Sequence, residues 1–400
     1  MAFKIGAREI RTLSELQIEE RVVFCRVDLN VPLNGEQVVD DTRIRGILPT
    51  LDYLISKGAK VVLASHLGRP KGKIEPQYSL LPIAQRLAEL TGRDIIFPDD
   101  CIGDGMKRLV QQQKSGEVVL LENLRFYAQE ERNDEAFAED LKGQTNLYIN
   151  DAFGVLHRAH ASTFALPRLY AERAAGFLVE KELKFLFPLI EEPRKPYAVI
   201  LGGAKVSDKI KVMENLLKKI DSLFLGGAMV FTFLKAMGNK IGNSLVEESM
   251  LELAGRLLNN ARQKGVKIYF PKDFVLGLSL ESPGESKTIE GLNIPEGWMG
   301  LDVGPSTIQY YAEHLSRMKT IFWNGPLGLY EKSPYDRGTL ALAKILAKLS
   351  ATRVIGGGDC AAAVEKAGVA GEMSHISTGG GATLEFLEGK ALPGLDALAV

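Results

Sequence analysis

Short apolar runs alternate along the chain with longer stretches in which apolar residues recur at helical spacing. The apolar runs cover residues 22–28, 60–65, 94–98, 118–123 and 147–153 in the first half, and 197–203, 222–227, 267–271, 320–326, 353–359 and 375–381 in the second. Alternation of this kind is typical of βαβ units, in which helices cover both faces of a parallel sheet. The pattern therefore predicts an α/β protein with parallel sheets.

A connecting segment separates the two halves. Residues 178–196 first show apolar positions at helical spacing and then a charged break that ends at a proline. A chain of 400 residues is too long for one ordinary core and indicates about two domains. We place the boundary near residue 190, in a connecting helix and hinge.

Composition and charge narrow the function classes. With 46% hydrophobic and 25% charged residues and a net charge of -1, the chain has the composition of a soluble globular protein without a broad nucleic-acid surface. No apolar run approaches the roughly 18 residues that would span a bilayer, and the first residues lack a secretory apolar core. The three cysteines form neither an even disulfide framework nor a CxxC pair. We expect a cytoplasmic protein with no membrane or nucleic-acid partner.

Cationic and polar residues follow the predicted strands of the first half, where ligands of open parallel sheets bind. They are Asp28, Asn30, Arg43, His66, Arg69, Arg125 and Arg158. A single arginine at a strand end is more often a surface ion pair, but four arginines and a histidine together favour an anion pocket. Asp28 and Asn30 fit either a turn or contacts to substrate hydroxyls, and His157 and His160 are interpreted as structural or surface groups.

Glycine clusters end the strands of the second half, at 202–203, 226–227, 356–358 and 379–381. One glycine pair is usually only a tight turn, whereas four clusters in one half favour a nucleotide site. After the first cluster, an apolar stripe predicts a helix that begins near Lys205. Lys205 and Lys209 would then lie one turn apart at the positive end of a helix, either on a solvated face beside Asp208 or against a phosphate.

Asp359 directly follows Gly356–Gly358, where a strand is predicted to end and a helix to begin. A helix N-terminus attracts anions, so a carboxylate there conflicts with a bound phosphate unless a divalent cation lies between them. The same glycines, with Ala361, fit the G-x-G-x-x-A form of a dinucleotide fingerprint, which leaves a nicotinamide-dependent dehydrogenase as an alternative. The fingerprint explains neither Asp359 nor the lack of an acidic residue near position 376.

No Walker A loop is present, because neither Gly-Lys pair is followed by Ser or Thr.

Several longer motifs carry a family resemblance. RVDLNVP, DDTRIR, SHLGRP, LLENLRF, NDAFGVLHRAH, LGGAKVSDKI, FLGGAMVFTFLK, LDVGP, WNGPLG, GGGD and STGGGATLEFLEGK follow one another between residues 21 and 390. In order and approximate spacing the chain resembles phosphoglycerate kinase. The resemblance implies transfer of the acyl phosphate of 1,3-bisphosphoglycerate to MgADP, giving 3-phosphoglycerate and ATP, in a typically monomeric enzyme.

The resemblance also implies a domain organisation. It implies two Rossmann-like, three-layer domains joined by a hinge helix, in an enzyme that closes around its substrates. The expected parts are a phosphoglycerate-binding domain (1–178), a connecting helix and hinge (179–195), a nucleotide-binding domain (196–386) and a tail (387–400) that returns to the first domain.

The site residues implied by the resemblance fall into three groups. The phosphoglycerate pocket would comprise Asp28, Leu29, Asn30, Arg43, His66, Leu67, Gly68, Arg69, Arg125 and Arg158. The nucleotide site would comprise Gly203, Lys205, Lys209, Gly226, Gly227, Gly300, Asn324, Pro326, Glu331, Gly357, Gly358, Asp359 and Cys360. The catalytic groups would be Arg43, nearest the reacting carboxyl, together with Lys205, Gly358 and Gly381, and Asp359 would hold nucleotide-bound Mg²⁺.

The residue types fit phosphoryl transfer, which needs positioning and preorganised positive groups. No general base is needed, because a carboxylate acceptor with a pKa of about 4 is already ionised at neutral pH. A non-catalytic binding protein with a hinge is a third possibility, but it would not need a metal-holding aspartate.

One residue departs from the family pattern. Cys360 stands where the family usually has Ser or Thr, which puts one hydrogen bond to the nucleotide phosphates in question. It is either a thiolate activated by the helix dipole or a small, buried, inert residue.

Overall fold

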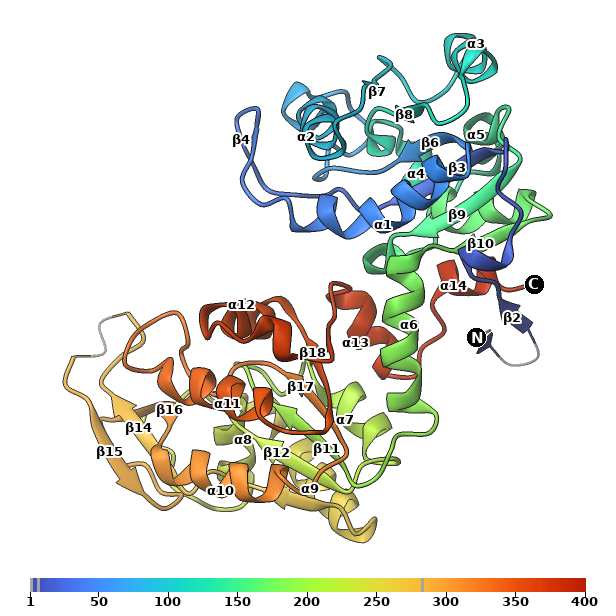
Figure 1. Cartoon of the computed structure of the whole chain (residues 1–400). Coiled ribbons are helices and arrows are strands. Elements are labelled where there is room, and N and C mark those ends of the chain that lie inside the picture. The colour runs from blue at the N-terminus through green and yellow to red at the C-terminus, as the bar shows by residue number, and fades with distance from the viewer. Residues whose placement is uncertain (1–2, 6–7, 282–283) are drawn as a thin grey trace. The chain divides into compact units, whose positions relative to one another are not determined.

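The computed structural model describes residues 3–5, 8–281 and 284–400, and it divides into two compact units (Figure 1). The N-terminal unit comprises residues 1–184 and 391–400, and the C-terminal unit comprises 185–390. The division therefore falls within helix α6 (Phe177–Ile190). Residues 1–2, 6–7 and 282–283, which belong to the predicted domains, lie outside the described residues.

A six-stranded parallel sheet forms the centre of the N-terminal unit. Its strand order is β10-β9-β3-β6-β8-β7, with β3 at Val22–Val27, β6 at Lys60–Ala64, β7 at Ile95–Ile96, β8 at Val118–Leu120, β9 at Leu147–Asp151 and β10 at Arg173–Ala175. Five of these strands were predicted. The three-residue β10 was not, because Arg-Ala-Ala lacks the β-branched and aromatic residues that mark a strand.

Helices cover both faces of this sheet. Val23, Cys25 and Leu63 share one core cluster with the apolar side of α1 (Thr42–Ser56) and α2 (Leu81–Thr91). On the other face, Val62 lies with side chains of α3 (Asp104–Gln112) and α5 (Glu135–Lys142). The unit also holds α4 (Ala128–Glu131) and two hairpins, β1–β2 (Phe3–Ile5, Arg8–Ile10) and β4–β5 (Leu33–Asn34, Gln37–Val38).

The chain returns to the N-terminal unit at its end, in helix α14 (Pro393–Leu398). The backbone N–H of Gly394 donates to the carbonyl of Leu156 at 2.9 Å. The N–H of Val400 donates to Glu9 at 2.9 Å. The tail is thereby hydrogen-bonded to two separate segments of this unit.

The C-terminal unit contains a second six-stranded parallel sheet, in which every strand was predicted. The order is β13-β12-β11-β17-β18-β19, with β11 at Tyr197–Leu201, β12 at Ser222–Leu225, β13 at Lys267–Tyr269, β17 at Thr320–Asn324, β18 at Thr352–Gly356 and β19 at His375–Ile376. One face shares a core cluster with α10 (Pro305–Leu315), α11 (Arg337–Ala347) and α12 (Gly358–Lys366). Ile268, on the other face, lies with residues of α8 (Met229–Ala236) and α9 (Leu251–Gln263).

The sequence did not reveal a small antiparallel sheet of this unit. It has the order β15-β14-β16, with strands at Lys287–Glu290, Asp273–Gly277 and Met299–Val303. Only residues 270–272 separate β13 from β14, and the predicted apolar run ended at residue 271, so β14 was not recognised as a second strand. The remaining helices are α7 (Ile210–Leu216) and α13 (Gly381–Leu387), which contact each other.

The predicted start of a helix near Lys205 is wrong. Residues 206–209 form a turn, and α7 begins only at Ile210. The apolar stripe that motivated the prediction is nevertheless real, since Val206 and Met213 are buried. Lys205 and Lys209 are therefore not one helical turn apart. No helix among the described residues is long and apolar enough to cross a membrane.

Candidate active site

The loops at the carboxyl ends of β3, β6, β8 and β9 carry most of the cationic and polar residues singled out in the N-terminal unit. These strands are parallel neighbours, so their carboxyl ends lie along one sheet edge. Two hydrogen bonds join three of the loops. The N–H of Gly68 donates to Oδ1 of Asn30 at 2.9 Å, and Nη1 of Arg125 donates to the carbonyl of Gly68 at 2.7 Å. The structure therefore brings Asn30, Gly68 and Arg125 together.

Arg43 reaches the same edge from helix α1. Its Nη1 donates to Oδ2 of Asp28 at 2.8 Å and to the carbonyl of Asn30 at 3.2 Å. The guanidinium side chain is 40% exposed, so it remains accessible to a ligand. Asp28 thus orients Arg43, a role that neither sequence interpretation of Asp28 included.

Buried cations give this edge its electrostatic character. His66 is buried, and burial together with Arg26, Arg125 and Arg158 holds its pKa well below the ordinary value. Burial and the same arginines lower the pKa of His160 to about 3. Both imidazoles are therefore neutral at physiological pH, while Arg26, Arg125 and Arg158 stay close enough to act on them.

Arg26 was not predicted; it lies near the carboxyl end of β3 and is 1% exposed. Its Nε donates to Oγ of Ser162 at 2.9 Å, and its Nη2 lies 3.1 Å from Nδ1 of His66. Ser162 in turn donates to the buried carboxylate of Glu130 at 2.5 Å. An arginine within an apolar strand was the available signal, because a buried cation needs partners.

Three residues predicted for the phosphoglycerate pocket do not direct a side chain into the hydrogen-bonded group formed by Asn30, Gly68 and Arg125. Arg69 is exposed, and no hydrogen bond or ion pair within the described residues joins it to the others. The side chains of Leu29 and Leu67 are buried. Their backbone N–H groups donate to Oγ of Ser65 at 2.9 Å and Oδ1 of Asn123 at 3.2 Å, so both leucines hold the loops in place.

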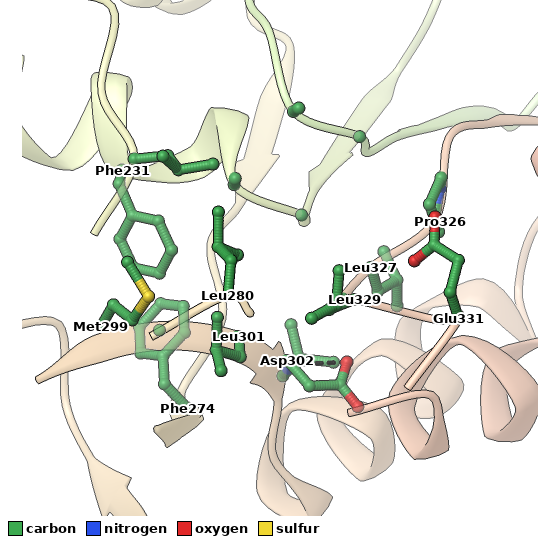
Figure 2. Close-up of a pocket in the computed structure, with 18 of the residues that line it drawn as sticks. Phe231, Phe274, Leu280, Met299, Leu301, Asp302, Pro326, Leu327, Leu329 and Glu331 are labelled. Atoms are coloured by element: carbon green, nitrogen blue, oxygen red, sulfur yellow. Dashed lines mark hydrogen bonds between the residues drawn. The ribbon is translucent and has the colours of Figure 1, made fainter. Parts of the chain in front are cut away.

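The C-terminal unit contains a cavity of about 180 Å³. Its walls include six residues predicted for the nucleotide site: Gly203, Gly227, Gly300, Pro326, Glu331 and Asp359. Figure 2 shows Glu331 and Pro326 close together on one side of this pocket, and Phe231, Met299 and Phe274 on the opposite side. The cavity therefore combines an apolar wall with a carboxylate end.

Close packing explains two of the glycines. A Cβ atom on Gly300 would lie 2.1 Å from the ring of Phe231, and one on Gly227 would lie 2.4 Å from the backbone nitrogen of Gly203. Gly227 also has a φ of +64°, which side chains rarely tolerate. Gly226, which was also predicted for the nucleotide site, is not among the residues that line the cavity.

The apolar wall was not predicted. It comprises Phe231, Leu245, Phe274, Leu280, Met299, Leu301, Val303, Leu327 and Leu329. Asp302 was also missed, although it lies among these residues and is labelled in Figure 2. Burial raises the pKa of Asp302 to about 8, against the effect of the N–H groups of Gly338 and Val303, which donate to it at 2.7 and 2.8 Å.

Two helices of this unit begin at glycines, and one of them, α12, contributes Asp359 to the cavity wall. Helix α12 starts at Gly358, with Gly357 before it, and α13 starts at Gly381. Because β18 and β19 are parallel neighbours, both helix N-termini lie at the same sheet edge. Asp359 is exposed in the first turn of α12, and the hydroxyl of Tyr330 donates to its Oδ1 at 3.3 Å. The helix termini supply N–H groups for an anion.

Lys209 is anchored at the same edge. Its ammonium donates to Oδ1 of Asn324, whose Nδ2 donates to the carbonyl of Gly356 at 2.7 Å. Burial lowers the pKa of Lys209, although Cys360, Asp208 and Asp359 oppose this effect. Lys205 is exposed.

The hypothesis of a reactive Cys360 is wrong. The residue does lie in the first turn of α12, but it is 0% exposed and packs in the core cluster. Its Sγ accepts a hydrogen bond from the N–H of Gly325 at 2.9 Å, and burial raises its pKa to about 12. Burial outweighs the helix dipole, so Cys360 is a protonated core residue.

Taken together, the two units define a class of protein. Both units have an α/β fold. One carries a cationic sheet edge, and the other has an apolar cavity with a carboxylate at one end, near helices that begin at glycines. These features indicate a phosphotransferase that uses a nucleotide. Comparison with known proteins then gives the family. The sequence model described as "Phosphoglycerate kinase" matches residues 13–390.

Relatives and solved structures agree with this match. The chain is 53% identical to "Phosphoglycerate kinase, cytosolic" of Triticum aestivum and 51% identical to "Phosphoglycerate kinase" of Anaeromyxobacter dehalogenans, covering 98% and 97% of this chain and 98% and 99% of those proteins. The structure of phosphoglycerate kinase from Coxiella burnetii superposes with a TM-score of 0.90 at 36% identity, covering 97% of this chain and 98% of the other. The chain belongs to the phosphoglycerate kinase family.

This membership confirms the predicted reaction class and fold. The chain is a phosphotransferase with a carboxyl group as acceptor, acting between 1,3-bisphosphoglycerate and ADP on one side and 3-phosphoglycerate and ATP on the other. The dehydrogenase and the non-catalytic binding protein are thereby excluded.

Proposed function

We propose that the cationic edge of the N-terminal unit binds 3-phosphoglycerate and its bisphosphorylated form. Arg125 and Arg158 would hold the distant phosphate, helped by the neutral donor His66. Planar guanidinium groups suit phosphate oxygens, and a partly desolvated cation binds an anion more strongly than an exposed one does. Support comes from the mutual proximity of Arg26, Arg125 and Arg158, each of which lowers the pKa of His66.

Arg43 is the residue proposed to act at the reacting carboxyl. Asp28 orients its guanidinium by a 2.8 Å hydrogen bond and leaves it 40% exposed. A cation held in this way stabilises charge that develops on the transferring phosphoryl group. Asn30 and Gly68 complete the proposed pocket, and Arg69 would join it from the exposed loop.

The nucleotide, we propose, binds in the C-terminal cavity. The observation that carries this proposal is that Glu331 and Asp359 line the same cavity as Gly203, Gly227 and Gly300. Adenine would lie against the apolar wall, and Glu331 would accept hydrogen bonds from the ribose hydroxyls. The phosphates would extend toward the N-termini of α12 and α13.

Mg²⁺ is the proposed cofactor, held by Asp359. The described residues contain no cluster of three or more metal-ligating side chains, but Mg²⁺ on a nucleotide is usually held by one or two carboxylates together with phosphate oxygens. The exposed carboxylate of Asp359, at a helix N-terminus that favours phosphate, fits such a cation. When bound, Mg²⁺ supplies positive charge to the nucleotide phosphates.

The remaining catalytic work would be positioning. Lys205, with the N–H groups of Gly358 and Gly381, would stabilise the equatorial oxygens of the phosphoryl group, and Lys209 would contact nucleotide phosphates. The acceptor carboxylate is already ionised, so no side chain removes a proton. Since the two proposed binding regions belong to different units, we propose that a hinge motion brings the substrates into line.

We further infer a monomer. We also infer that it is located in the cytoplasm, because the wheat relative is named cytosolic. Separate binding titrations test the assignment of the two sites. Calorimetry should show that Arg125→Ala weakens only 3-phosphoglycerate binding and that Glu331→Ala weakens only ADP binding. The opposite pattern, or unchanged affinities in both variants, would refute it.

A further inference from the structure

The loop at residues 204–209, which we call the Lys205 loop, joins β11 to α7. Because the loop precedes α7, its N–H groups have no helical partners and need hydrogen-bond acceptors from elsewhere in the chain. The carboxylate of Glu247, far along the chain, supplies them. The N–H groups of Val206 and Ser207 both donate to Oε2 of Glu247, at 2.5 and 3.0 Å. The hydroxyl of Ser207 donates to the other oxygen, Oε1, at 2.6 Å.

Glu247 is itself held in place. Its backbone N–H donates to Oγ1 of Thr232 at 3.1 Å, and Thr232 is a buried residue of helix α8. The carboxylate is ionised at neutral pH: partial burial acts against ionisation, but the hydrogen bonds from Ser207 and Val206 and the charge of Lys205 lower its pKa. Hydrogen bonds to an ionised acceptor are about twice as strong as those between neutral groups. Glu247 therefore fixes the loop to α8.

The hydrogen bonds between Glu247 and the loop leave the ammonium of Lys205 available to bind a ligand. Lys205 is exposed, and within the described part of the chain no ion pair engages its ammonium. The carboxylate oxygens of Glu247 are instead occupied by the next two residues of the loop. Glu247 can thus order the backbone that carries Lys205 without forming an ion pair with its ammonium, although the two charges attract each other through space.

We propose that Glu247 is a positioning residue for the phosphotransfer reaction, acting through the Lys205 loop on the ammonium of Lys205. This inference rests on the role proposed above for Lys205. Glu247 does not touch the substrates; it holds the loop so that the ammonium can meet the transferring phosphoryl group without first being ordered. Such preorganisation affects turnover more than ground-state binding.

A double-mutant cycle tests the proposal, with Glu247→Gln, Lys205→Ala and the double variant measured for kcat and KM. A glutamine keeps the shape but presents one NH₂ group in place of an acceptor oxygen. We expect Glu247→Gln to lower kcat by about tenfold or more, in line with the loss of charge-assisted hydrogen bonds, with little change in KM. In the Lys205→Ala background the same change should cost no more than about twofold. The matched control is Glu248→Gln, because Glu248 is the adjacent exposed carboxylate and pairs with Lys235 instead.

The outcomes separate the two proposals. Loss of turnover in Lys205→Ala together with wild-type kcat in Glu247→Gln would overturn the inference and leave the role of Lys205 intact. Equal losses from Glu247→Gln in both backgrounds would also overturn it, since Glu247 would then act independently of Lys205. Wild-type turnover in Lys205→Ala would instead refute the role of Lys205 on which the inference rests. As a readout independent of activity, amide hydrogen exchange at Val206 and Ser207 should accelerate in Glu247→Gln and stay unchanged in Glu248→Gln.

Discussion

Nη1 of Arg43 lies 2.8 Å from Oδ2 of Asp28, and this contact joins helix α1 to the loop that follows β3. The guanidinium is oriented by a carboxylate of the protein and keeps part of its surface exposed. Such an arrangement suits a group that has to be in position before the charge of the transition state develops.

Replacing Arg43 should therefore act on turnover. We expect Arg43→Ala to lower kcat by on the order of a hundredfold or more, comparable to the loss of one donor from an oxyanion hole. Steady-state kinetics with 3-phosphoglycerate and MgATP measure the effect. Arg45→Ala is the control, because Arg45 lies two positions along the same helix and pairs with Asp41. Equal kcat values for Arg43→Ala and Arg45→Ala would remove Arg43 from the reaction.

Glu331 should distinguish nucleotides by their ribose hydroxyls. We expect Glu331→Gln to raise the KM for ADP by about tenfold, the effect of losing one charged hydrogen bond, and to reduce the preference for ADP over 2′-deoxy-ADP. Kinetics with both nucleotides give the comparison. Glu313→Gln, a change at an exposed carboxylate of α10, serves as control. An undiminished preference for ADP in Glu331→Gln would contradict the ribose contact.

Cys360 should be inert in the folded protein. Because Cys25, Cys101 and Cys360 are all buried and burial raises the pKa of each thiol, alkylating reagents should modify them slowly at pH 8 and rapidly only after unfolding. MgADP should not change the rate at Cys360 beyond its effect on unfolding. Peptide mass spectrometry after timed alkylation measures each site. Rapid modification of native Cys360 that MgADP blocks would restore the reactive-thiol hypothesis.

Asp302 should make stability depend on pH. Its pKa is about 8 in the folded protein, mainly because of burial, and about 4 in an unfolded chain. Its contribution to the free energy of unfolding is therefore fully present below about pH 4 and is lost as the pH rises through 8. The difference in unfolding free energy between wild type and Asp302→Asn should therefore fall with pH, by at most about 1.4 kcal/mol per unit. Urea unfolding at pH 5, 6.5 and 8 measures this difference. A difference independent of pH would show that Asp302 titrates normally.

The sequence predicted the parallel sheets because apolar runs that end in glycine or polar residues are a local signal. Long-range contacts account for what it could not predict. The N–H groups of Val206 and Ser207 donate to Glu247, and nothing near Lys205 in the sequence indicates this long-range contact or the turn that precedes α7. The reactivity of Cys360 depended on whether its side chain faces the core or the phosphate loop, which residue type alone does not decide.

Only part of the candidate site could be predicted, again because some of its residues are brought together by long-range contacts. Glycines and charged residues at strand ends are conspicuous in a sequence, and Gly203, Glu331 and Asp359 do line one cavity. The apolar wall was not recognised, because Phe231 and Met299 look like ordinary core residues until the fold leaves space between them. Arg26 was missed since its partners, Ser162 and His66, are distant in the sequence.

We propose above that Asp359 holds the cation of a nucleotide bound in the C-terminal cavity. The most direct test of this proposal is a Mg²⁺ titration of ATP-dependent phosphorylation of 3-phosphoglycerate by wild type, Asp359→Asn and the control Glu365→Gln, an exposed carboxylate farther along α12. We predict that Asp359→Asn unfolds at the wild-type temperature and requires about tenfold or more Mg²⁺ for half-maximal activity, as expected for a lost metal ligand. Superimposable Mg²⁺ titrations for all three proteins would contradict the account.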